Sequence, residues 1–462
     1  MDRSVDSIQQ RLTSYACALT YEALTVEAIH AAKVRVIDTL GALMGGYSGE
    51  PCGIVRALAA DMPNADGATV IGTRLKTTPD MAAFVNGTTA RYVEMNDVYH
   101  SPGSKGGHPS DVIMPVLAVA EHVRASGREL ITAVVLAYEI YLRFSDAVQT
   151  PGFDAANFCC VGSAAAAGKL LGLTPGQLSH AIAMAVVPNN ALNQGRTGHL
   201  SMWKAVAAGQ AGRAGVFAAL LARAGMEGPH MPFEGKAGWC NHVAREQFAL
   251  DTLGGNSTPF KIGDTLIKQR SSCATTISSI LAAEKVSAGL GDIDAVDRVT
   301  VEVYERAKVG MGTGEHHWHP DSRETADHSI PYVVAAAMMD GTVTPLSFDA
   351  EHLKSPTLRA LLPKIEVVAN PEFTAAYERL PVEHRTRITA VTRDGTRVVG
   401  EAGGDQGDLS DHKDDTVIAA KFRALTEPML GGERVDAILE RLWNLEIVPD
   451  VAAIPPLFAG GN

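Results

Sequence analysis

The first 262 residues follow the hydrophobic pattern of successive helices. Apolar residues recur at helical spacing among strong helix formers such as Ala, Leu and Met. Glycine and proline separate these segments, for example at Gly45-Gly46 and at Pro175. The pattern predicts helices over residues 28–44, 111–125, 129–148, 161–171, 175–187 and 201–224. Several of them are dense in Ala and Gly, which indicates closely packed, buried helices.

The pattern changes after about residue 263. Residues 298–304 alternate apolar and polar side chains with a period of two, as a half-buried strand does. Residues 364–369 are predicted to form a second strand, and a hairpin is predicted where 386–392 and 396–400 flank Asp394-Gly395. Two helical segments, 275–286 and 331–339, complete this region. The mixture is typical of a small α+β domain.

From Asp411 to Asn444 the pattern is helical again, and we expect these helices to return to the first domain. A chain of 462 residues is too long for one ordinary core. We therefore predict a mainly α protein with a large, discontinuous all-helical domain and a smaller α+β domain. The helical domain would comprise residues 1–262 and 405–462, and the α+β domain residues 263–404.

Composition narrows the function classes. A hydrophobic content of 46% with 20% charged residues is that of a globular chain. The net charge of −12 argues against a nucleic-acid partner, because phosphate contacts need a basic face. The longest apolar stretches, such as 131–141, are too short to span a membrane, and residues 1–6 resemble no signal peptide. We therefore expect no membrane partner. Six scattered cysteines show no disulfide spacing, so we also expect reduced thiols and a cytoplasmic location.

The most unusual segment is the loop 91–111, which combines acids, an amide, two histidines and three glycines before an apolar helix. His108 lies just before that helix, where backbone N–H groups can also hold a carboxylate. The alternative is a polar surface loop whose histidines have no role. Lys204 begins another apolar helix, and it either binds a carboxylate or extends its amine to solvent.

Other cofactor chemistry is not indicated. Residues 315–319 contain three histidines but no zinc motif, so we expect no metal site. The glycines at 310, 312 and 314 lack the dinucleotide-binding spacing, and there is no P-loop or G-x-S-x-G motif. Acid–base chemistry by side chains alone, without a cofactor, is the enzymatic option that remains.

Three motifs carry a resemblance to a known family. They are Gly107-His108-Pro109-Ser110-Asp111, Ser201-Met-Trp-Lys204, and Arg323-Glu-Thr-Ala-Asp-His-Ser-Ile-Pro-Tyr332 followed by Asp340-Gly341. The chain resembles the MmgE/PrpD family over about residues 28–422. That family includes 2-methylcitrate dehydratase, cis-aconitate decarboxylase and iminodisuccinate epimerase. The resemblance implies a helical domain built from both chain ends, an α+β domain, a homodimer, and a metal-free active site between the domains.

The resemblance also implies site residues. His108 matches the proton-transferring histidine, Lys204 and Lys268 match substrate-facing lysines, and Glu94 stands where an aspartate is usual. The candidate catalytic residues are His108, Lys204, Tyr332, Glu94 and Asp154. The candidate substrate-binding residues are Arg91, Asn96, Asp97, Lys268, Arg270 and Cys273.

The chain departs from the family pattern at three places. Val98 replaces a threonine, Asp154-Ala155 stands near the position of a family histidine, and residues 269–275 contain no histidine. We expect a hydro-lyase that acts on a small hydroxy di- or tricarboxylate, with His108 handling the carbon-bound proton and Glu94 or Asp154 assisting at the hydroxyl. The alternatives are a decarboxylase or epimerase using the same pocket, a non-catalytic relative that binds polycarboxylates, and a purely structural oligomer.

Overall fold

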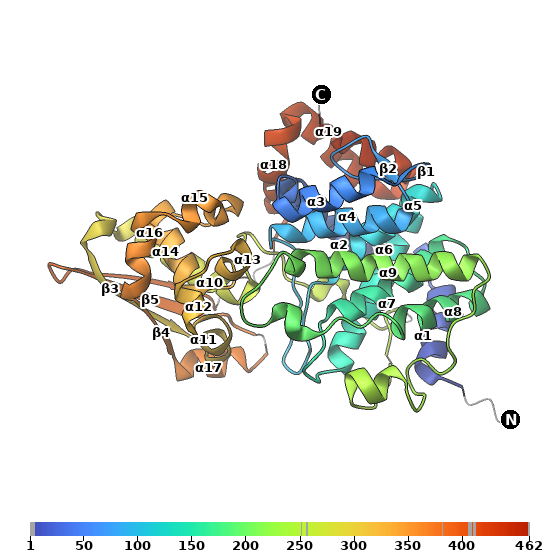
Figure 1. Cartoon of the computed structure of the whole chain (residues 1–462), viewed down its shortest axis with the longest axis horizontal. Helices are drawn as coiled ribbons and strands as arrows, with labels where there is room; N and C mark the ends of the chain where they lie inside the picture. Colours follow the sequence, from blue (N-terminus) through green and yellow to red (C-terminus); the bar gives the residue numbers. More distant parts are fainter. Residues whose placement is uncertain are drawn as a thin grey trace.

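The structure is a computed structural model that describes residues 5–250, 252–255, 257–380, 382–404, 409 and 413–460. It consists of a larger helical lobe and a smaller lobe that contains a β-sheet, lying side by side (Figure 1). The predicted mainly α fold with a smaller α+β part is confirmed.

The helical lobe contains α1 (Ser7–Ala18), α2 (Val26–Gly46), α3 (Glu50–Ala60), α4 (Pro79–Tyr92), α5 (Ile113–His122), α6 (Gly127–Ala147), α7 (Ala156–Leu170), α8 (Pro175–Val186) and α9 (Trp203–Arg223). All six helices predicted in this region are present, with shifted ends. The lobe also carries a two-stranded antiparallel ribbon, β1 (Pro63–Thr69) and β2 (Lys76–Thr77), so it is not purely helical. The ribbon was not predicted, because β1 is short, largely polar and half exposed and so lacks the alternating apolar pattern of a strand.

Helix α9 is the central helix of this lobe and packs against α4 and α7. The crossing with α4 is close: a Cβ atom at Gly209 would lie only 2.6 Å from the carbonyl oxygen of Phe84. By length and composition α9 could cross a membrane, but 72% of its apolar window is buried inside the protein. Packing in the core accounts for that composition. Lys204 lies in the first turn of α9 and is buried.

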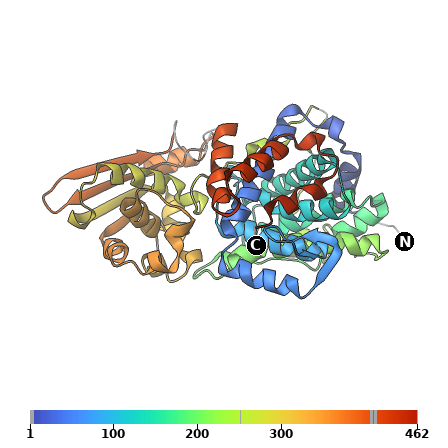
Figure 2. The same cartoon turned by 90° about the horizontal axis from the view of Figure 1, so that it is seen from above.

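The sheet of the smaller lobe has the strand order β4-β3-β5-β6. Its strands are β3 (Val296–Val303), β4 (Ile365–Ala369), β5 (Thr386–Thr392) and β6 (Arg397–Ala402). Strand β3 is parallel to β4 and antiparallel to β5, and β5 and β6 form the predicted hairpin, with Gly395 at a φ of 87°. The sheet lies along one side of the lobe and helices cover its other side (Figure 2).

Two helices predicted from sequence, α10 (Ile277–Gly289) and α14 (Ile330–Asp340), pack against each other beside the sheet. The shorter helices around them are α11 (Glu305–Met311), α12 (Glu315–Trp318), α13 (Arg323–Ala326), α15 (Ala350–Leu353), α16 (Pro356–Leu361) and α17 (Pro371–Tyr377). In Figure 1, α13 lies on the side of this lobe that faces the helical lobe. The segment that follows α13 is thereby available to a site between the lobes.

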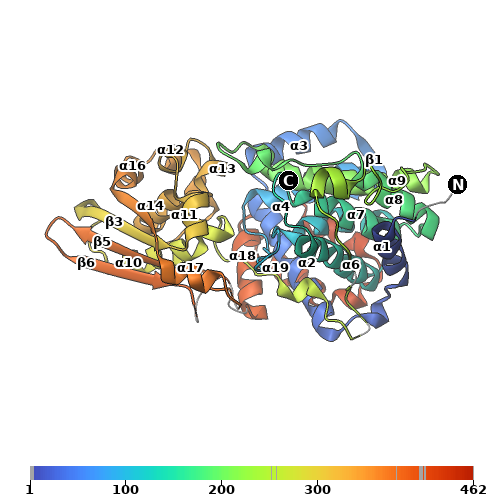
Figure 3. The ribbon, with the colours of Figure 1, turned by 90° about the horizontal axis from the view of Figure 1, so that it is seen from below.

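The C-terminal helices α18 (Asp415–Leu430) and α19 (Gly432–Trp443) return to the helical lobe and lie beside α2 (Figure 3). Two large apolar cores follow the same division: Ile267 and Ile418 belong to one core, and Ala274 and Ala402 to the other. The domain boundaries at 262/263 and 404/405 stay predictions. Residues 405–408, 410–412, 461 and 462, which the second boundary assigns to the helical domain, lie outside the described residues, and so does the predicted helix start at Asp411.

A buried ion pair joins α18 to α2. Lys421 Nζ donates to Asp38 Oδ1 at 2.6 Å and to the carbonyl oxygen of Met95 at 2.7 Å. Burial raises the pKa of Asp38, and Lys421 opposes that effect. The C-terminal helix is therefore tied both to the core of the lobe and to the loop that contains His108.

Replacing Lys421 by Met should destabilise the protein strongly. Asp38 would be left buried without its cation, which typically costs about 3–5 kcal/mol. Urea unfolding followed by circular dichroism would measure the loss. The double variant Lys421→Met/Asp38→Leu should recover much of it, and a single variant as stable as the wild type would contradict this role for the pair.

Candidate active site

The site is built around Glu94, at the point where α4 ends. The backbone reverses there with Glu94 in the left-handed region, at a φ of 53°. A residue with a Cβ pays roughly 1–2 kcal/mol in this conformation, which glycine usually occupies after a helix. The turn directs the Glu94 side chain into the protein, where only 1% of it is exposed.

Three cations surround the Glu94 carboxylate. Oε2 lies 2.7 Å from Arg91 Nη1 and 3.1 Å from Lys204 Nζ, and Oε1 lies 2.9 Å from Lys268 Nζ. Burial alone would raise the pKa of Glu94, but Arg91, Lys204 and Lys268 hold it well below its usual range. The cations come from α4, α9 and the segment before α10. The Glu94 carboxylate therefore links two helices of the helical lobe to the segment that leads into the α+β lobe.

His108 approaches the same carboxylate. Its Nδ1 lies 2.8 Å from the carbonyl oxygen of Asp97, and because a carbonyl can only accept, Nδ1 must carry the hydrogen. The other nitrogen, Nε2, then has a free lone pair, and it lies 3.6 Å from Glu94 Oε1. Burial, aided by Arg91, lowers the pKa of His108 well below its usual value. At neutral pH His108 is therefore an uncharged imidazole able to accept a proton.

Asp97 holds the His108 loop in shape. Its Oδ1 accepts the backbone N–H of Ser110 at 3.0 Å, and its Oδ2 accepts the hydroxyl of Tyr138 at 3.1 Å. The backbone N–H of His108 donates to the Tyr141 hydroxyl at 3.0 Å. Gly107 is required here, since its φ is 130° and a Cβ would lie 2.2 Å from that hydroxyl. Asp97 thus positions His108, and its predicted contact with the substrate stays a prediction.

A second acidic centre lies in the α+β lobe, directly after α13. Both oxygens of Asp327 accept hydrogen bonds from Lys204 Nζ, at 2.7 and 2.8 Å. Nδ1 of His328 lies 2.6 Å from Asp327 Oδ1. Lys204 therefore bridges Glu94 and Asp327. A continuous chain of contacts runs from His108 through Glu94, Lys204 and Asp327 to His328, across the two lobes.

Cys273 faces His328. Its backbone N–H donates to the carbonyl oxygen of Asp327 at 3.0 Å, and its thiol is hydrogen-bonded to the His328 ring. Although burial opposes it, His328 lowers the pKa of Cys273 to about 7. Burial and Lys204 would lower the pKa of His328, but Cys273 and Asp327 raise it above its usual value. These opposite shifts favour transfer of the thiol proton from Cys273 to the His328 ring.

Sequence reasoning missed His328 and Asp327 as site residues. Both lie within the motif Arg323–Tyr332, from which only Tyr332 was selected. The adjacent Asp-His pair was the available signal, because a carboxylate next to an imidazole can orient and charge it.

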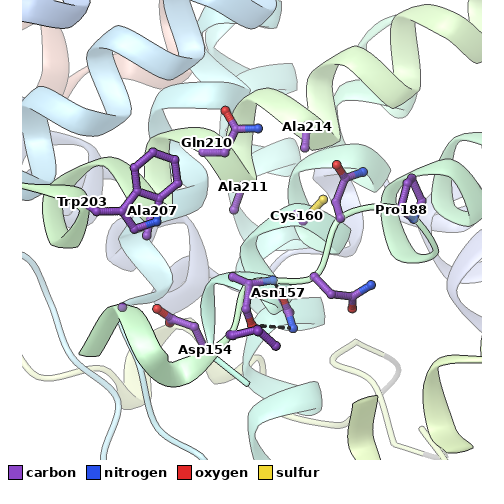
Figure 4. A pocket seen from close by; sticks show the side chains of 14 residues that line it. Asp154, Asn157, Cys160, Pro188, Trp203, Ala207, Gln210, Ala211 and Ala214 are labelled. Carbon is purple, nitrogen blue, oxygen red and sulfur yellow. Dashed lines mark hydrogen bonds between the residues drawn. The ribbon is translucent and has the colours of Figure 1, made fainter. Parts of the chain in front are cut away.

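Asp154 lies to one side of this chain of contacts. Its Oδ2 accepts a hydrogen bond from Arg196 Nε at 2.8 Å, and Arg196 Nη1 donates to the carbonyl oxygen of Lys204 at 3.0 Å. Asp154 lines a cavity of about 350 Å³ together with Asn157, Trp203 and other side chains of α7, α9 and the loop between α8 and α9 (Figure 4). Arg196, which sequence reasoning did not identify, connects this cavity to the start of α9.

Three predicted residues have other surroundings. Arg270 forms a two-pronged ion pair with Glu284, at 2.6 and 2.9 Å. The Tyr332 hydroxyl donates to the carbonyl oxygen of Ser347 at 2.8 Å inside the α+β core. The structure therefore does not bring Arg270 or Tyr332 to the cluster. Asn96 is buried within the loop 91–111, and no hydrogen bond to its Oδ1 is found within the described residues.

Among the residues that the structure describes, no group of three or more His, Cys, Asp or Glu side chains is arranged to hold a metal ion. The histidine-rich segment 315–319 lies mainly in α12, where the rings of His316 and His317 contact each other. Whether the chain works without a metal stays a prediction.

Replacing Tyr332 by Phe tests its place in the core. The variant loses one buried hydrogen bond, so it should unfold with a free energy lower by about 0.5–1.5 kcal/mol. Turnover should stay at the wild-type level in a steady-state assay. A variant of unchanged stability and greatly reduced turnover would instead restore Tyr332 to the catalytic set.

Comparison with known proteins places this geometry in a family. The N-terminal domain of the MmgE/PrpD family matches residues 10–251, and the C-terminal domain matches residues 271–445. Human cis-aconitate decarboxylase is 26% identical, over 95% of this chain and 91% of the relative. The 2-methylcitrate dehydratase of Escherichia coli K12 is 27% identical, over 82% of this chain and 81% of the relative. The two domain matches span most of the sequence, and the chain belongs to the MmgE/PrpD family.

Proposed function

We propose that this chain is a metal-independent hydro-lyase that removes water from, or adds water to, a small hydroxy polycarboxylate. The observation that carries the proposal is the state of His108: a neutral imidazole with a free Nε2, held beside a buried cluster of cations. The relatives named 2-methylcitrate dehydratase and cis-aconitate decarboxylase support a lyase that acts on such acids.

The first step is the removal of a proton from the carbon beside a substrate carboxylate. His108 Nε2 accepts this proton, and the electrons of the C–H bond move into the carboxylate, which takes on enolate character. Lys204, Lys268 and Arg91 supply the positive charge that stabilises it. The Asp97 carbonyl keeps His108 in the correct tautomer and stabilises the imidazolium that forms.

The second step is the departure of the hydroxyl group on the neighbouring carbon. His328 donates a proton to it, the C–O bond breaks as the C=C bond forms, and water leaves. We assign this role to His328 because Cys273 and Asp327 keep it protonated, while burial and Arg91 keep His108 neutral. Two groups whose pKa values are pushed apart in one site suit the acid and base roles. This revises the expectation that Glu94 or Asp154 assists at the hydroxyl.

We also propose a cytoplasmic homodimer. Trp203 and Phe217 on α9 are about half exposed, at 53% and 51%. Large exposed aromatic side chains on one helix are typical of a protein–protein contact. A second copy of the chain is the occupant we expect, and the proposed chemistry does not depend on it.

Decarboxylation is the second candidate, favoured by the human cis-aconitate decarboxylase relative, whose match spans 95% of this chain. In that reaction the C–C bond to a carboxylate breaks and CO₂ leaves instead of water. The resulting carbanion then takes up a proton. Epimerisation shares the same proton transfer. NMR of the products would distinguish the three reactions. Decarboxylation releases CO₂, dehydration forms a new C=C bond without loss of carbon, and epimerisation only inverts a stereocentre.

Replacing His108 by Gln should abolish proton transfer. A positioned base typically contributes about 10²–10⁴-fold, so turnover should fall on that scale. With the wild type in deuterated water, the substrate or product should gain deuterium beside the carboxylate. NMR would follow this exchange, which should persist in the presence of a chelator because side-chain cations bind the acid.

His100 provides the control in the same loop. His100→Gln should cost far less activity than His108→Gln, because the His100 ring faces His384 rather than Glu94. Exchange that requires His100 and not His108 would show that the wrong histidine was assigned. A wild-type protein that binds carboxylic acids without any exchange would favour the non-catalytic alternative.

The pH dependence of kcat/KM should be bell-shaped. Activity should fall in acid as His108 becomes protonated, below its usual pKa, and fall in alkali as His328 loses its proton, above its usual pKa. Cys273→Ser removes the acidic thiol group that raises the pKa of His328, so the alkaline limb should move to lower pH. Cys17→Ser, at an exposed cysteine, should leave both limbs in place. An alkaline limb unmoved by Cys273→Ser would exclude this role for the pair.

A further inference from the structure

A polycarboxylate needs binding groups beyond the cluster around Glu94. That cluster would hold the substrate carboxylate beside His108, and its three cations are already paired with carboxylates of the protein. Asp111 faces one of them as well, since its Oδ1 lies 3.7 Å from Arg91 Nε. A further substrate carboxylate requires donors of its own, because a buried anion without partners is very costly.

Arg196 has such donors. It lies in the loop between α8 and α9, and two hydrogen bonds fix its guanidinium group. Nε donates to Asp154 Oδ2 at 2.8 Å, and Nη1 donates to the carbonyl oxygen of Lys204 at 3.0 Å. A guanidinium has five N–H groups in one plane, and no hydrogen bond from Nη2 is found within the described residues. Arg196 can therefore bind a carboxylate without leaving Asp154.

Arg196 and His328 line the same small cavity between the two lobes, with a volume of about 60 Å³. A cavity needs roughly 10–15 Å³ to hold one water molecule, so this one has room for a carboxylate group. Among the described residues that line it, none is acidic and four are basic: Arg196, His316, His317 and His328. A space surrounded by basic side chains and by no carboxylate favours an anion.

His317 offers a second donor in this cavity. It is only 5% exposed, and its Nδ1 has no hydrogen-bond partner within the part of the chain that the structure describes. Burial, together with His316 and His328, lowers the pKa of His317 to about 4. An anion in the cavity would oppose this effect and favour a ring that carries a proton on Nδ1.

We propose that Arg196 and His317 form a second carboxylate subsite for the substrate, beside His328. The inference rests on the proposed function and extends it. The subsite holds a carboxylate remote from His108 and so places the leaving hydroxyl group near His328. Lys204 connects the two subsites, because its amine lies in the first cluster and its carbonyl oxygen holds Arg196.

Arg196→Gln tests the subsite. Calorimetry would measure binding of lactate (a hydroxy monocarboxylate), malate (a dicarboxylate) and citrate (a tricarboxylate). The variant should bind malate or citrate, whichever the wild type prefers, about tenfold or more weakly, since a charge-assisted hydrogen bond is worth at least that factor. Its affinity for lactate should change little, because lactate needs only the first cluster. Equal losses for all three acids would overturn the proposal, because Arg196 would then act only through Lys204.

Two further variants separate substrate binding from folding. Arg196→Gln/Asp154→Asn leaves no buried carboxylate without its cation, and it should bind the polycarboxylate as weakly as Arg196→Gln does. Recovery of the wild-type affinity in this double variant would overturn the proposal. His317→Gln removes Nδ1, and it should weaken polycarboxylate binding about two- to tenfold, the range for a neutral hydrogen bond. An unchanged affinity would exclude His317 from the subsite.

Arg143 provides the matched control. Its Nε lies 2.7 Å from the buried carboxylate of Glu139, its Nη2 donates to the carbonyl oxygen of Pro259 at 3.2 Å, and its side chain is 17% exposed, against 20% for Arg196. Arg143→Gln/Glu139→Gln should therefore bind all three acids as the wild type does. An equal loss of affinity in this control would trace the effect to the helical lobe as a whole and overturn the subsite.

Deuterium exchange separates this inference from the proposed function. A wild type that exchanges protons through His108, with polycarboxylate binding unaffected by Arg196→Gln, would overturn only the second subsite. Binding that depends on Arg196, without proton exchange in any acid, would overturn the proposed function and leave the subsite in place. A wild type that binds none of the three acids would overturn both.

Discussion

The structure depends on the burial of one ionised carboxylate among three cations. An unpaired charge in the protein interior is very costly, so Glu94 can be ionised only where Arg91, Lys204 and Lys268 converge. Those cations belong to separate elements, and Lys204 also holds Asp327 of the other lobe. The electrostatic requirement of a single side chain therefore determines how α4, α9 and the start of the α+β lobe must meet.

The same network shifts the pKa values of the two histidines in opposite directions. Burial and Arg91 hold the pKa of His108 well below its usual value, whereas Cys273 and Asp327 raise the pKa of His328. Neither ring carries this property by itself, since free imidazoles have nearly identical acidity. The contacts among these side chains, rather than any one ring, shift the two pKa values in opposite directions.

Sequence patterns predicted most of the fold, because periodicity reports which face of an element is buried. They located α2, α5, α6, α7, α8, α9 and the β5–β6 hairpin, but did not identify α1, α3 and α4. The β1–β2 ribbon had no such period. In the site, motifs identified His108, Lys204, Lys268 and Glu94, but could not distinguish a residue that contacts the substrate from one that supports its neighbours. Asp97 holds a loop and Tyr332 fills a core, whereas His328, marked in the sequence only by the adjacent Asp327, was not selected.

The bond from Lys421 to the Met95 carbonyl has a consequence for synthesis of the chain. Met95 adjoins Glu94, and its partner lies more than three hundred residues later, in α18. A growing polypeptide carries His108 and all three cations long before Lys421 leaves the ribosome. Until then Asp38 lacks its ion-pair partner and the turn at Glu94 lacks its outer support. The turn at Glu94 therefore gains this support only after α18 has been synthesised and has folded back beside α2.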